Sequence, residues 1–321
     1  MIINTTEAAS LLLQNDNILI LTHKNPDGDT LGSGYALCRA LLKLGKKAKV
    51  LCSDAIPKKY KYMFNSIKQV DFEPKFIVAV DVADTKLFGE EFEKLYSSKV
   101  DLCIDHHGSN IIYAKKTCLC AEDAATAEII YRIIVKLGVK IDEDIANCIY
   151  TGLSTDTGCF RYSNTTANTY RIAAEMVDAG AKSADINCLM FESKAISFLN
   201  LQKLCIEGME LYYDNKCAIV TLTQSMFNKS GANENECEAI SAMARQVEGV
   251  LVGATMRERP DGTYKISIRT HSPVDAAKIC AKMNGGGHKR AAGCELNLPL
   301  EQARKLLLEY IAIALKEACE E

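Results

Sequence analysis

The chain has 321 residues, with 38 lysines and arginines against 41 aspartates and glutamates, a formal net charge of −3. Domains of roughly 100–200 residues already bury most of their unfolded surface, so two domains with substantial cores are expected without stabilising disulfides. The near-neutral charge excludes a protein that holds long nucleic-acid duplexes by bulk positive charge, because such binding depends on clustered lysine and arginine.

The first half of the sequence predicts alternating strands and helices. Short apolar runs bounded by charged or turn residues are typical of strands buried on both faces of a parallel sheet, and they occur at residues 17–22, 48–51, 76–80 and 100–104. Helical spacing of apolar residues occurs at 31–44, 124–136, 142–153 and 166–179. This pattern predicts an α/β domain with a parallel sheet.

A long helix is predicted over residues 185–211, where the strand alternation stops. The segments beyond it predict strands at 217–222, 250–256 and 264–269, and helices at 236–246, 274–282 and 300–318. Pro260-Asp261-Gly262 predicts a hairpin turn between the last two strands. We therefore expect a parallel-sheet N-terminal domain (1–184), a helical linker (185–212) and a smaller α/β C-terminal domain (213–321).

The 14 cysteines do not have the spacing of a metal site. No Cys-x-x-Cys occurs, the closest pair is Cys118 and Cys120, and most others lie in apolar runs where a reduced thiol behaves as a small hydrophobic group. The N-terminus lacks a basic segment, and no apolar run approaches the roughly 20 residues that span a bilayer. We expect a soluble chain in the reducing cytoplasm, with no membrane partner.

Three of the predicted strands end in side chains that bind metals. His23, Asp27 and Asp29 follow the first, Asp81 follows the strand at 76–80, and Asp105-His106-His107 follows the next. Because the carboxyl ends of parallel strands meet at one edge of a sheet, we expect these side chains to converge.

A fourth candidate, Asp156, follows the predicted helix at 142–153 and would by itself indicate a helix cap or an Asx turn. Aspartate and histidine at this density suit Mn²⁺ or a similar divalent ion better than structural zinc, which favours cysteine. These aspartates and histidines supply more ligands than one metal ion needs. We expect a two-metal site with one bridging carboxylate, an arrangement that suits hydrolysis of phosphate esters.

A glycine-rich segment near the end of the chain predicts a phosphate-binding loop. Its glycines let backbone N–H groups approach a ligand closely, and the histidine and the following Lys289-Arg290 offer groups to a phosphate. Arg269, at the end of a predicted strand, favours the same interpretation, and a flexible turn is the alternative. The residues of the segment are Gly285, Gly286, Gly287 and His288.

These segments resemble the four motifs of the DHH phosphoesterases, and the C-terminal segment resembles the substrate-binding domain of the RecJ-like branch. The resemblance covers nearly the whole chain in the family's order. It implies two Mn²⁺ ions, with Mg²⁺ or Co²⁺ as alternatives, and a bridging Asp81. The implied ligands are His23 and Asp27 for one ion, and Asp29, His106 and Asp156 for the other.

The resemblance also implies roles for residues outside the ligand set. Asp105 would orient its neighbouring histidine, and His107 would face the scissile phosphate. Arg269 and residues 285–288 would bind the far phosphate or nucleotide end of the substrate. Many family members have a further glycine where this chain has Asn284, so the geometry of that phosphate contact is open.

Within the family, the chain resembles the nanoRNase/PAP phosphatase group. It lacks the added modules of RecJ-type exonucleases, the transmembrane segments of membrane-bound cyclic-di-AMP phosphodiesterases and the Arg-Lys-Lys signature of family II pyrophosphatases. The resemblance implies hydrolysis of very short RNA to mononucleotides and of 3′-phosphoadenosine 5′-phosphate (PAP) to AMP, without binding to long duplexes, and suggests a homodimer. The alternatives are a cyclic-di-AMP or pApA phosphodiesterase and a non-catalytic nucleotide-binding protein, which the complete ligand set disfavours.

Overall fold

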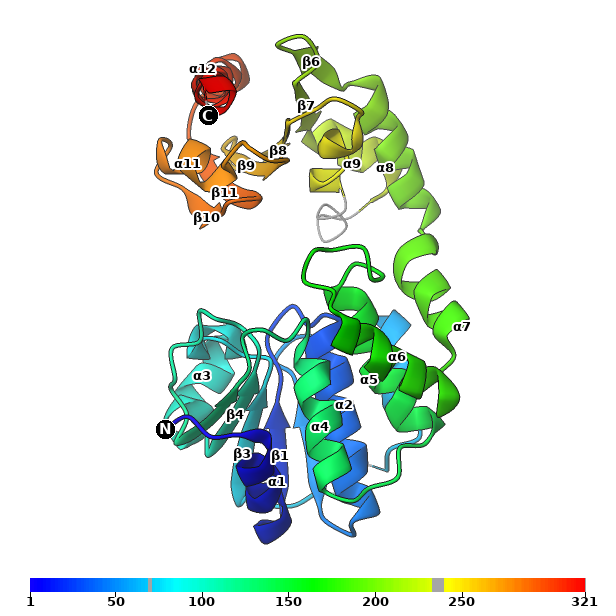
Figure 1. Cartoon of the computed structure of the whole chain (residues 1–321). Helices are drawn as coiled ribbons and strands as arrows, with labels where there is room; N and C mark the ends of the chain where they lie inside the picture. The colour runs from blue at the N-terminus through cyan, green and yellow to red at the C-terminus, as the bar shows by residue number, and fades with distance from the viewer. Residues whose placement is uncertain (69–70, 233–239, 321) are drawn as a thin grey trace. The chain divides into compact units, whose positions relative to one another are not determined.

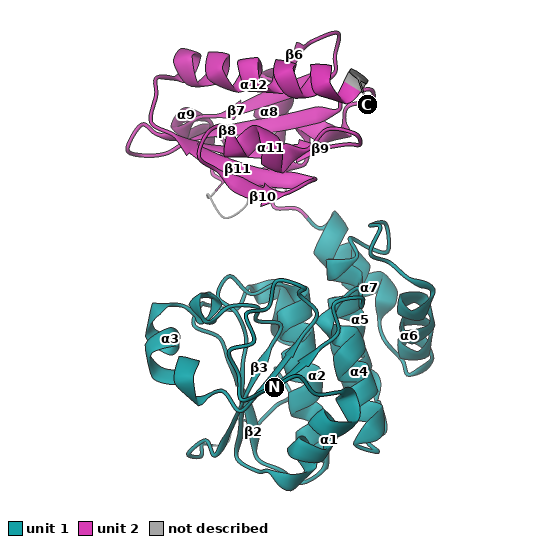
Figure 2. Cartoon of the chain, turned by 60° about the vertical axis from the view of Figure 1, so that its left-hand side comes forward, with its two compact units in different colours: residues 1–193 teal, residues 194–321 magenta. Residues whose placement is uncertain are grey.

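The computed structural model describes residues 1–68, 71–232 and 240–320. The chain divides between Ser193 and Lys194 into two compact units, each of which has its own sheet (Figure 2). The α/β fold class expected from the sequence is confirmed for both.

The first unit is built on a parallel sheet whose strands are arranged in the order β2-β1-β3-β4-β5. The strands are β1 (Ile18–Leu21), β2 (Ala48–Leu51), β3 (Phe76–Val80), β4 (Leu102–Asp105) and β5 (Lys116–Leu119). β1, β3 and β4 are buried along their whole length, which explains their continuous apolar sequences. β5 was not predicted, because its Lys-Thr-Cys-Leu sequence lacks such a run.

Helices cover both faces of this sheet (Figure 1). Those of the first unit are α1 (Thr5–Gln14), α2 (Gly28–Lys43), α3 (Glu90–Tyr96), α4 (Thr126–Lys136), α5 (Glu143–Asp156), α6 (Ala167–Asp178) and α7 (Ser183–Asn187). Alternate residues of β1 face opposite cores. Ile18 and Ile20 pack with α1, α2, α4 and α5, whereas Leu19 and Leu21 pack with Phe88 and the α3 side.

Helices α2 and α5 approach each other closely through glycine. A Cβ on Gly32 of α2 would lie 2.3 Å from the carbonyl oxygen of Cys148, and one on Gly152 of α5 would lie 2.6 Å from Oδ1 of Asp29. Because no larger residue fits at either position, the two helices hold Asp29 and the end of α5 side by side. α5 extends past the predicted helix at 142–153, so Asp156 is the last residue of the helix and does not lie in a loop. Gly158 follows with a φ of 56°, a left-handed conformation that cannot continue the helix.

The single helix predicted over 185–211 is interrupted. α7 continues into a π-helical turn (Cys188–Glu192), Ser193 is extended, and α8 (Ile196–Glu207) begins in the second unit. The mixed polar and apolar pattern did not reveal this break, because residues 188–195, where it occurs, contain neither glycine nor proline.

The second unit contains a mixed sheet in the order β10-β11-β9-β8-β7-β6, in which only the β7–β8 pair is parallel. Its strands are β6 (Glu210–Tyr212), β7 (Cys217–Leu222), β8 (Val252–Glu258), β9 (Tyr264–Thr270), β10 (Gly286–His288) and β11 (Ala291–Leu296). α11 (Ala276–Ala281) and α12 (Leu300–Glu320) pack on one face, and α8 and α9 (Gln224–Ser230) pack on the other.

Two elements of this unit differ from the prediction or fall partly outside the described residues. The glycine-rich segment expected to be a loop forms the β10–β11 hairpin with Lys289-Arg290 at its turn, and its glycines hid the strands. The predicted helix at 236–246 begins within residues 233–239, outside the described residues, and Ala244–Gln246 form a short 3₁₀ turn. Over the described ranges, no helix is long and apolar enough to cross a bilayer.

Candidate metal centre

The predicted metal-binding side chains lie at the carboxyl ends of β1, β3 and β4, which are adjacent in the sheet. His23 lies two residues beyond β1, Asp81 directly follows β3, and Asp105 is the last residue of β4. Asp27 and Asp29 belong to the start of α2, which follows β1. The convergence expected from the parallel sheet is therefore present.

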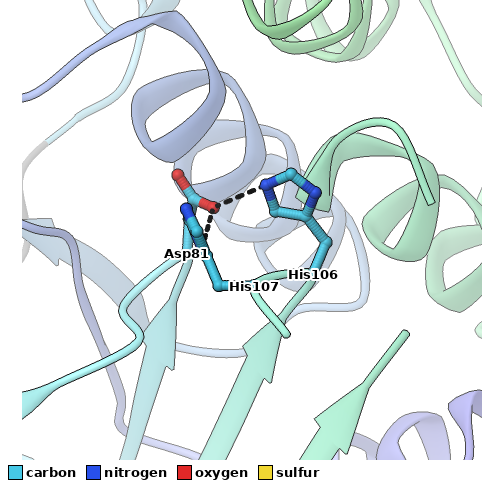
Figure 3. Close-up of side chains that lie close together, drawn as sticks. All are labelled: Asp81, His106 and His107. Carbon is cyan, nitrogen blue, oxygen red and sulfur yellow. Dashed lines mark ion pairs between the residues drawn. The ribbon is translucent and has the colours of Figure 1, made fainter. Parts of the chain in front are cut away.

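The carboxylate of Asp81 lies between three histidine rings. Its Oδ2 atom is 3.7 Å from Nε2 of His23, and its Oδ1 atom is 3.8 Å from Nε2 of His106 and 3.6 Å from Nδ1 of His107. Figure 3 shows the second of these oxygens directed at the last two histidines. Asp81 is 2% exposed and has a φ of 62°, a left-handed conformation that aspartate tolerates better than most residues.

The donor atoms gather into three sets that fit a divalent cation, with carboxylate oxygens and imidazole nitrogens within 4.8 Å of one another in each. Such mixed oxygen and nitrogen donors suit Mn²⁺ or a similar ion. Asp81 belongs to two of the sets, and Nε2 of His106 lies 3.5 Å from Oδ2 of Asp156 in the remaining one. The sets are His23, Asp27 and Asp81; Asp81, His106 and His107; and Asp29, His106 and Asp156.

The carboxylates of this centre need compensating cations. Burial, and then the charge of Asp81, raises the pKa of Asp29 to about 7. Burial, and then the charge of Asp27, raises the pKa of Asp81 to about 6. Burial opposes protonation of His23, but its hydrogen bond to Asp27 and the charge of that carboxylate outweigh burial and raise the pKa of His23 to about 9. Protons or metal ions would relieve the repulsion among the buried carboxylates.

Backbone carbonyls orient two of the histidines. Nδ1 of His23 lies 2.7 Å from the carbonyl oxygen of Lys24, and Nδ1 of His106 lies 3.0 Å from that of Asp123. A carbonyl can only accept, so Nδ1 carries the proton in the neutral ring and Nε2 presents its lone pair to the carboxylates.

Asp105 and His107 form a pair beside the centre. The fully buried Asp105 accepts hydrogen bonds from the backbone N–H of His106 and from Nδ1 of His107, at 2.9 and 2.7 Å, and its other oxygen accepts one from Asn110 at 2.6 Å. Asp105 therefore orients His107 and belongs to none of the three donor sets found among the described residues. The side chain of His107 is 43% exposed, against 13% for His106, so His107 is the more accessible ring.

Sequence reasoning missed the contribution of α4. The backbone N–H of Thr126 donates to Oδ2 of Asp29 at 2.7 Å, that of Ala127 donates to Oδ1 at 3.0 Å, and the Thr126 hydroxyl donates to Asp81 at 2.8 Å. A threonine at the start of a predicted helix is a common capping residue, but nothing in its local sequence connects it with Asp29 or Asp81.

The second unit holds the predicted anion-binding residues on one hairpin and the adjoining strand. Arg269 of β9 lies opposite Ala291 of β11, next to the β10–β11 turn. A Cβ on Gly285 would lie 2.3 Å from the carbonyl oxygen of Gly293, and one on Gly287 (φ 144°) would lie 2.6 Å from that of Ala291. Close packing within the hairpin therefore requires both glycines, independently of any ligand. Gly286 and His288 are exposed.

Comparisons with known proteins agree with this arrangement. Residues 17–153 match the DHH family N-terminal domain, and residues 214–317 match the DHHA1 domain. The bifunctional oligoribonuclease and PAP phosphatase NrnA of Thermus thermophilus is 32% identical over 308 residues, which cover 94% of this chain and 91% of the relative. The chain belongs to the DHH family. The predicted resemblance to this family of hydrolases is confirmed.

Solved structures support the fold of this DHH protein. An exopolyphosphatase-related protein from Bacteroides fragilis superposes with a TM-score of 0.86 at 26% identity, covering 96% of this chain and 95% of that one. An exonuclease RecJ bound to manganese superposes with a TM-score of 0.55 at 13% identity, covering 99% and 95%. The similarity to the exonuclease RecJ shows a shared fold.

Proposed function

We propose that this DHH protein is a phosphoesterase with two Mn²⁺ ions that hydrolyses oligoribonucleotides of a few residues and PAP. The observation that carries the proposal is the position of Asp81, whose two oxygens face His23 on one side and His106 on the other. The name of the Thermus thermophilus relative supports these substrates, and the manganese bound to an exonuclease RecJ supports the choice of ion.

The donor sets suggest how the ions would be held. Asp81 would serve both, and the remaining ligands are His23 and Asp27 for one ion, and Asp29, His106 and Asp156 for the other. When bound, two such ions would neutralise charge on the phosphoryl oxygens and lower the pKa of an attacking water.

His107 would bind the phosphate directly. The hydrogen bond from Nδ1 to Asp105 is the largest of the effects that raise the pKa of His107 to about 9 in the metal-free protein, and it favours the protonated ring. Since Asp105 occupies Nδ1, the Nε2–H is left to donate a hydrogen bond to a phosphoryl oxygen. Asp105 and His107 are therefore our catalytic candidates.

The second unit would bind the remote end of the substrate. Arg269, the glycines Gly285, Gly286 and Gly287, and His288 combine a guanidinium, exposed backbone and an imidazole at one end of the sheet, as recognition of a terminal phosphate or nucleotide requires. We propose residues 1–184 as the catalytic domain, 213–321 as the substrate-binding domain and 185–212 as the linker.

Hydrolysis assays test the proposal. The protein, stripped of metal and reloaded with Mn²⁺, should release mononucleotides from a labelled RNA dinucleotide and convert PAP to AMP. Comparison of pApA with cyclic-di-AMP separates a linear-substrate enzyme from a cyclic-dinucleotide phosphodiesterase. Hydrolysis of other phosphoesters with no release from RNA or PAP would refute the substrate assignment.

A matched pair of variants tests the role of Asp81. Asp81→Asn should abolish turnover, because it removes a ligand that both ions would share. Asp84→Asn is the control, since Asp84 lies outside the three donor sets found among the described residues and its carboxylate accepts a hydrogen bond from the backbone N–H of Lys86. Full activity of Asp81→Asn would contradict the bridging role.

A further inference from the structure

The loop that follows Asp156 has an unusual backbone. Gly158, Cys159 and Phe160 have φ values of 56°, 60° and 60°, three consecutive residues in the left-handed region. This conformation is uncommon for cysteine and costly for phenylalanine, and strained backbone of this kind concentrates at functional sites.

The loop is held rigidly beside the metal centre. The fully buried Thr157 accepts hydrogen bonds at its carbonyl oxygen from the N–H groups of Arg161 and Tyr162, both at 3.0 Å. Nδ2 of Asn164 donates to the carbonyl oxygen of Asp156 at 3.2 Å. Because consecutive Cα atoms are about 3.8 Å apart, Gly158 lies within about 8 Å of Asp156, whose carboxylate is 3.5 Å from His106.

The strained backbone presents an aromatic ring to solvent. A Cβ on Gly158 would lie 2.3–2.6 Å from three ring atoms of Tyr162, so this ring packs directly on the glycine backbone. Tyr162 is nevertheless 56% exposed. One side of the ring is therefore supported by the loop while much of its surface remains open to a ligand.

Aromatic rings of α5 and α6 also pack against the loop. Phe160 stacks on Tyr170 of α6 with 5.6 Å between ring centroids and 25° between planes, and the Tyr170 hydroxyl donates to the carbonyl oxygen of Phe160 at 3.2 Å. Phe160 also contacts Tyr150 of α5, with centroids 5.8 Å apart. The exposed Arg161 adds a positive charge to the same loop, and its Nε donates to the carbonyl oxygen of Gly158 at 2.6 Å.

We infer that Tyr162 is a stacking platform for a nucleobase of the substrate, on the first unit and in the loop that follows Asp156. An exposed, backbone-supported tyrosine provides the flat surface on which a base of any identity stacks, and the neighbouring guanidinium suits the phosphates that accompany it. The inference rests on the proposed function. It adds to that proposal a base-binding residue on the first unit, which does not belong to the β10–β11 hairpin.

Steady-state kinetics with matched substrates test the platform. Tyr162→Ala should raise KM for an adenine dinucleotide about tenfold, within the range measured for loss of one base–aromatic stack, and should leave kcat within about twofold. For an otherwise identical dinucleotide that is abasic at the stacked position, KM should be the same in Tyr162→Ala as in the unaltered protein. Tyr162→Phe keeps an aromatic ring, so its KM for the intact dinucleotide should equal that of the unaltered protein. The two abasic isomers identify which base is stacked.

A binding measurement tests the platform without turnover. The fluorescence of 2-aminopurine riboside 5′-monophosphate falls when its base stacks, so the whole protein in Mg²⁺ buffer should quench it, and Tyr162→Ala should lose most of that quenching. Absence of quenching by the unaltered protein would overturn the inference. In the kinetic test, an equal rise in KM for the intact and the abasic dinucleotides in Tyr162→Ala would also overturn the inference, because it would show that Tyr162 only supports Asp156. Normal quenching without hydrolysis of RNA or PAP would instead refute the proposed function and leave the platform standing.

Discussion

Oδ2 of Asp29 accepts a hydrogen bond of 2.7 Å from the backbone N–H of Thr126, so a residue of α2 caps helix α4. The residue at the N-cap position, Ala125, has no side chain that could do so. Asp29 also belongs to the donor set with His106 and Asp156. The same carboxylate therefore joins two helices and faces the metal centre.

Because of this dual role, we expect substitution of Asp29 to lower stability more than substitution of Asp156. Substitution of either by alanine should abolish hydrolysis, since each removes a proposed metal ligand, and each relieves repulsion among the carboxylates. Asp29→Ala also leaves two buried N–H groups without a partner. We therefore expect the metal-free Asp29→Ala protein to have a free energy of unfolding about 1–2 kcal/mol below that of Asp156→Ala. Urea denaturation of both variants measures this difference, and equal stabilities would contradict the capping role.

The hydroxyl of Thr126 should influence metal affinity through Asp81. Thr126→Val keeps the side-chain shape and the backbone cap but removes the donor to Oδ1 of Asp81. Loss of a hydrogen bond to a metal ligand typically costs about 10–100-fold in affinity or activity. We expect weaker Mn²⁺ binding of this order by calorimetry, and recovery in Thr126→Ser. An unchanged affinity in the valine variant would show that Asp81 needs no such support.

The stabilisation provided by Mn²⁺ should increase as the pH rises from 5 to 9. In the metal-free protein the pKa values of Asp81 and Asp29 are raised to about 6 and 7, and that of His23 to about 9. All three shifts favour the protonated form in the folded state, so their contribution to stability is greatest at low pH and is lost as the pH rises through these values. Metal ions compete with the same protons, so they bind more tightly as the pH rises.

Thermal unfolding with EDTA or with saturating Mn²⁺ provides the measurement. The difference in Tm between the two conditions should be small at pH 5 and should grow steadily towards pH 9. Asp81→Asn should largely remove this dependence. A difference that does not vary with pH would show that these groups are not the metal ligands.

Cys120 should be alkylated faster than buried cysteines at neutral pH. A hydrogen bond from the Cys118 thiol, and secondarily the charge of Arg132, lowers the pKa of Cys120 to about 7 despite partial burial. The rate of modification by iodoacetamide, followed by peptide mass spectrometry, should reach half its maximum near pH 7, because the thiolate is the reactive form. Cys118→Ala should move that midpoint to higher pH. The fully buried Cys217, whose pKa burial raises to about 12, is the internal control.

Much of the first unit could be predicted from the sequence for a simple physical reason. β1, β3 and β4 are buried on both faces, so each has to be continuously apolar, and the polar residues directly after them stand out. The parallel arrangement then requires that His23, Asp81 and the Asp105–His107 segment share one edge. The amino-acid order alone therefore determined the composition of the centre.

Local patterns failed where contacts between distant segments decide the structure. β5 is short and partly polar, and the break between α7 and α8 has no glycine or proline to mark it. The glycines of residues 285–287 indicated a loop, yet pairing with β11 makes Gly286 and Gly287 part of a strand. In each case the surrounding fold, rather than local propensity, determines the backbone.

The sequence by itself determined which groups are available for chemistry: the apolar strands, the aspartates and histidines that follow them, and the family to which they belong. Only the tertiary structure decided what those groups do to one another. Asp29 caps α4, Thr126 donates to Asp81, and the ring of Tyr162 packs on the backbone of Gly158. These contacts depend on distances of a few ångströms, and the two hydrogen bonds join segments that are far apart in the chain, so they exist only after folding.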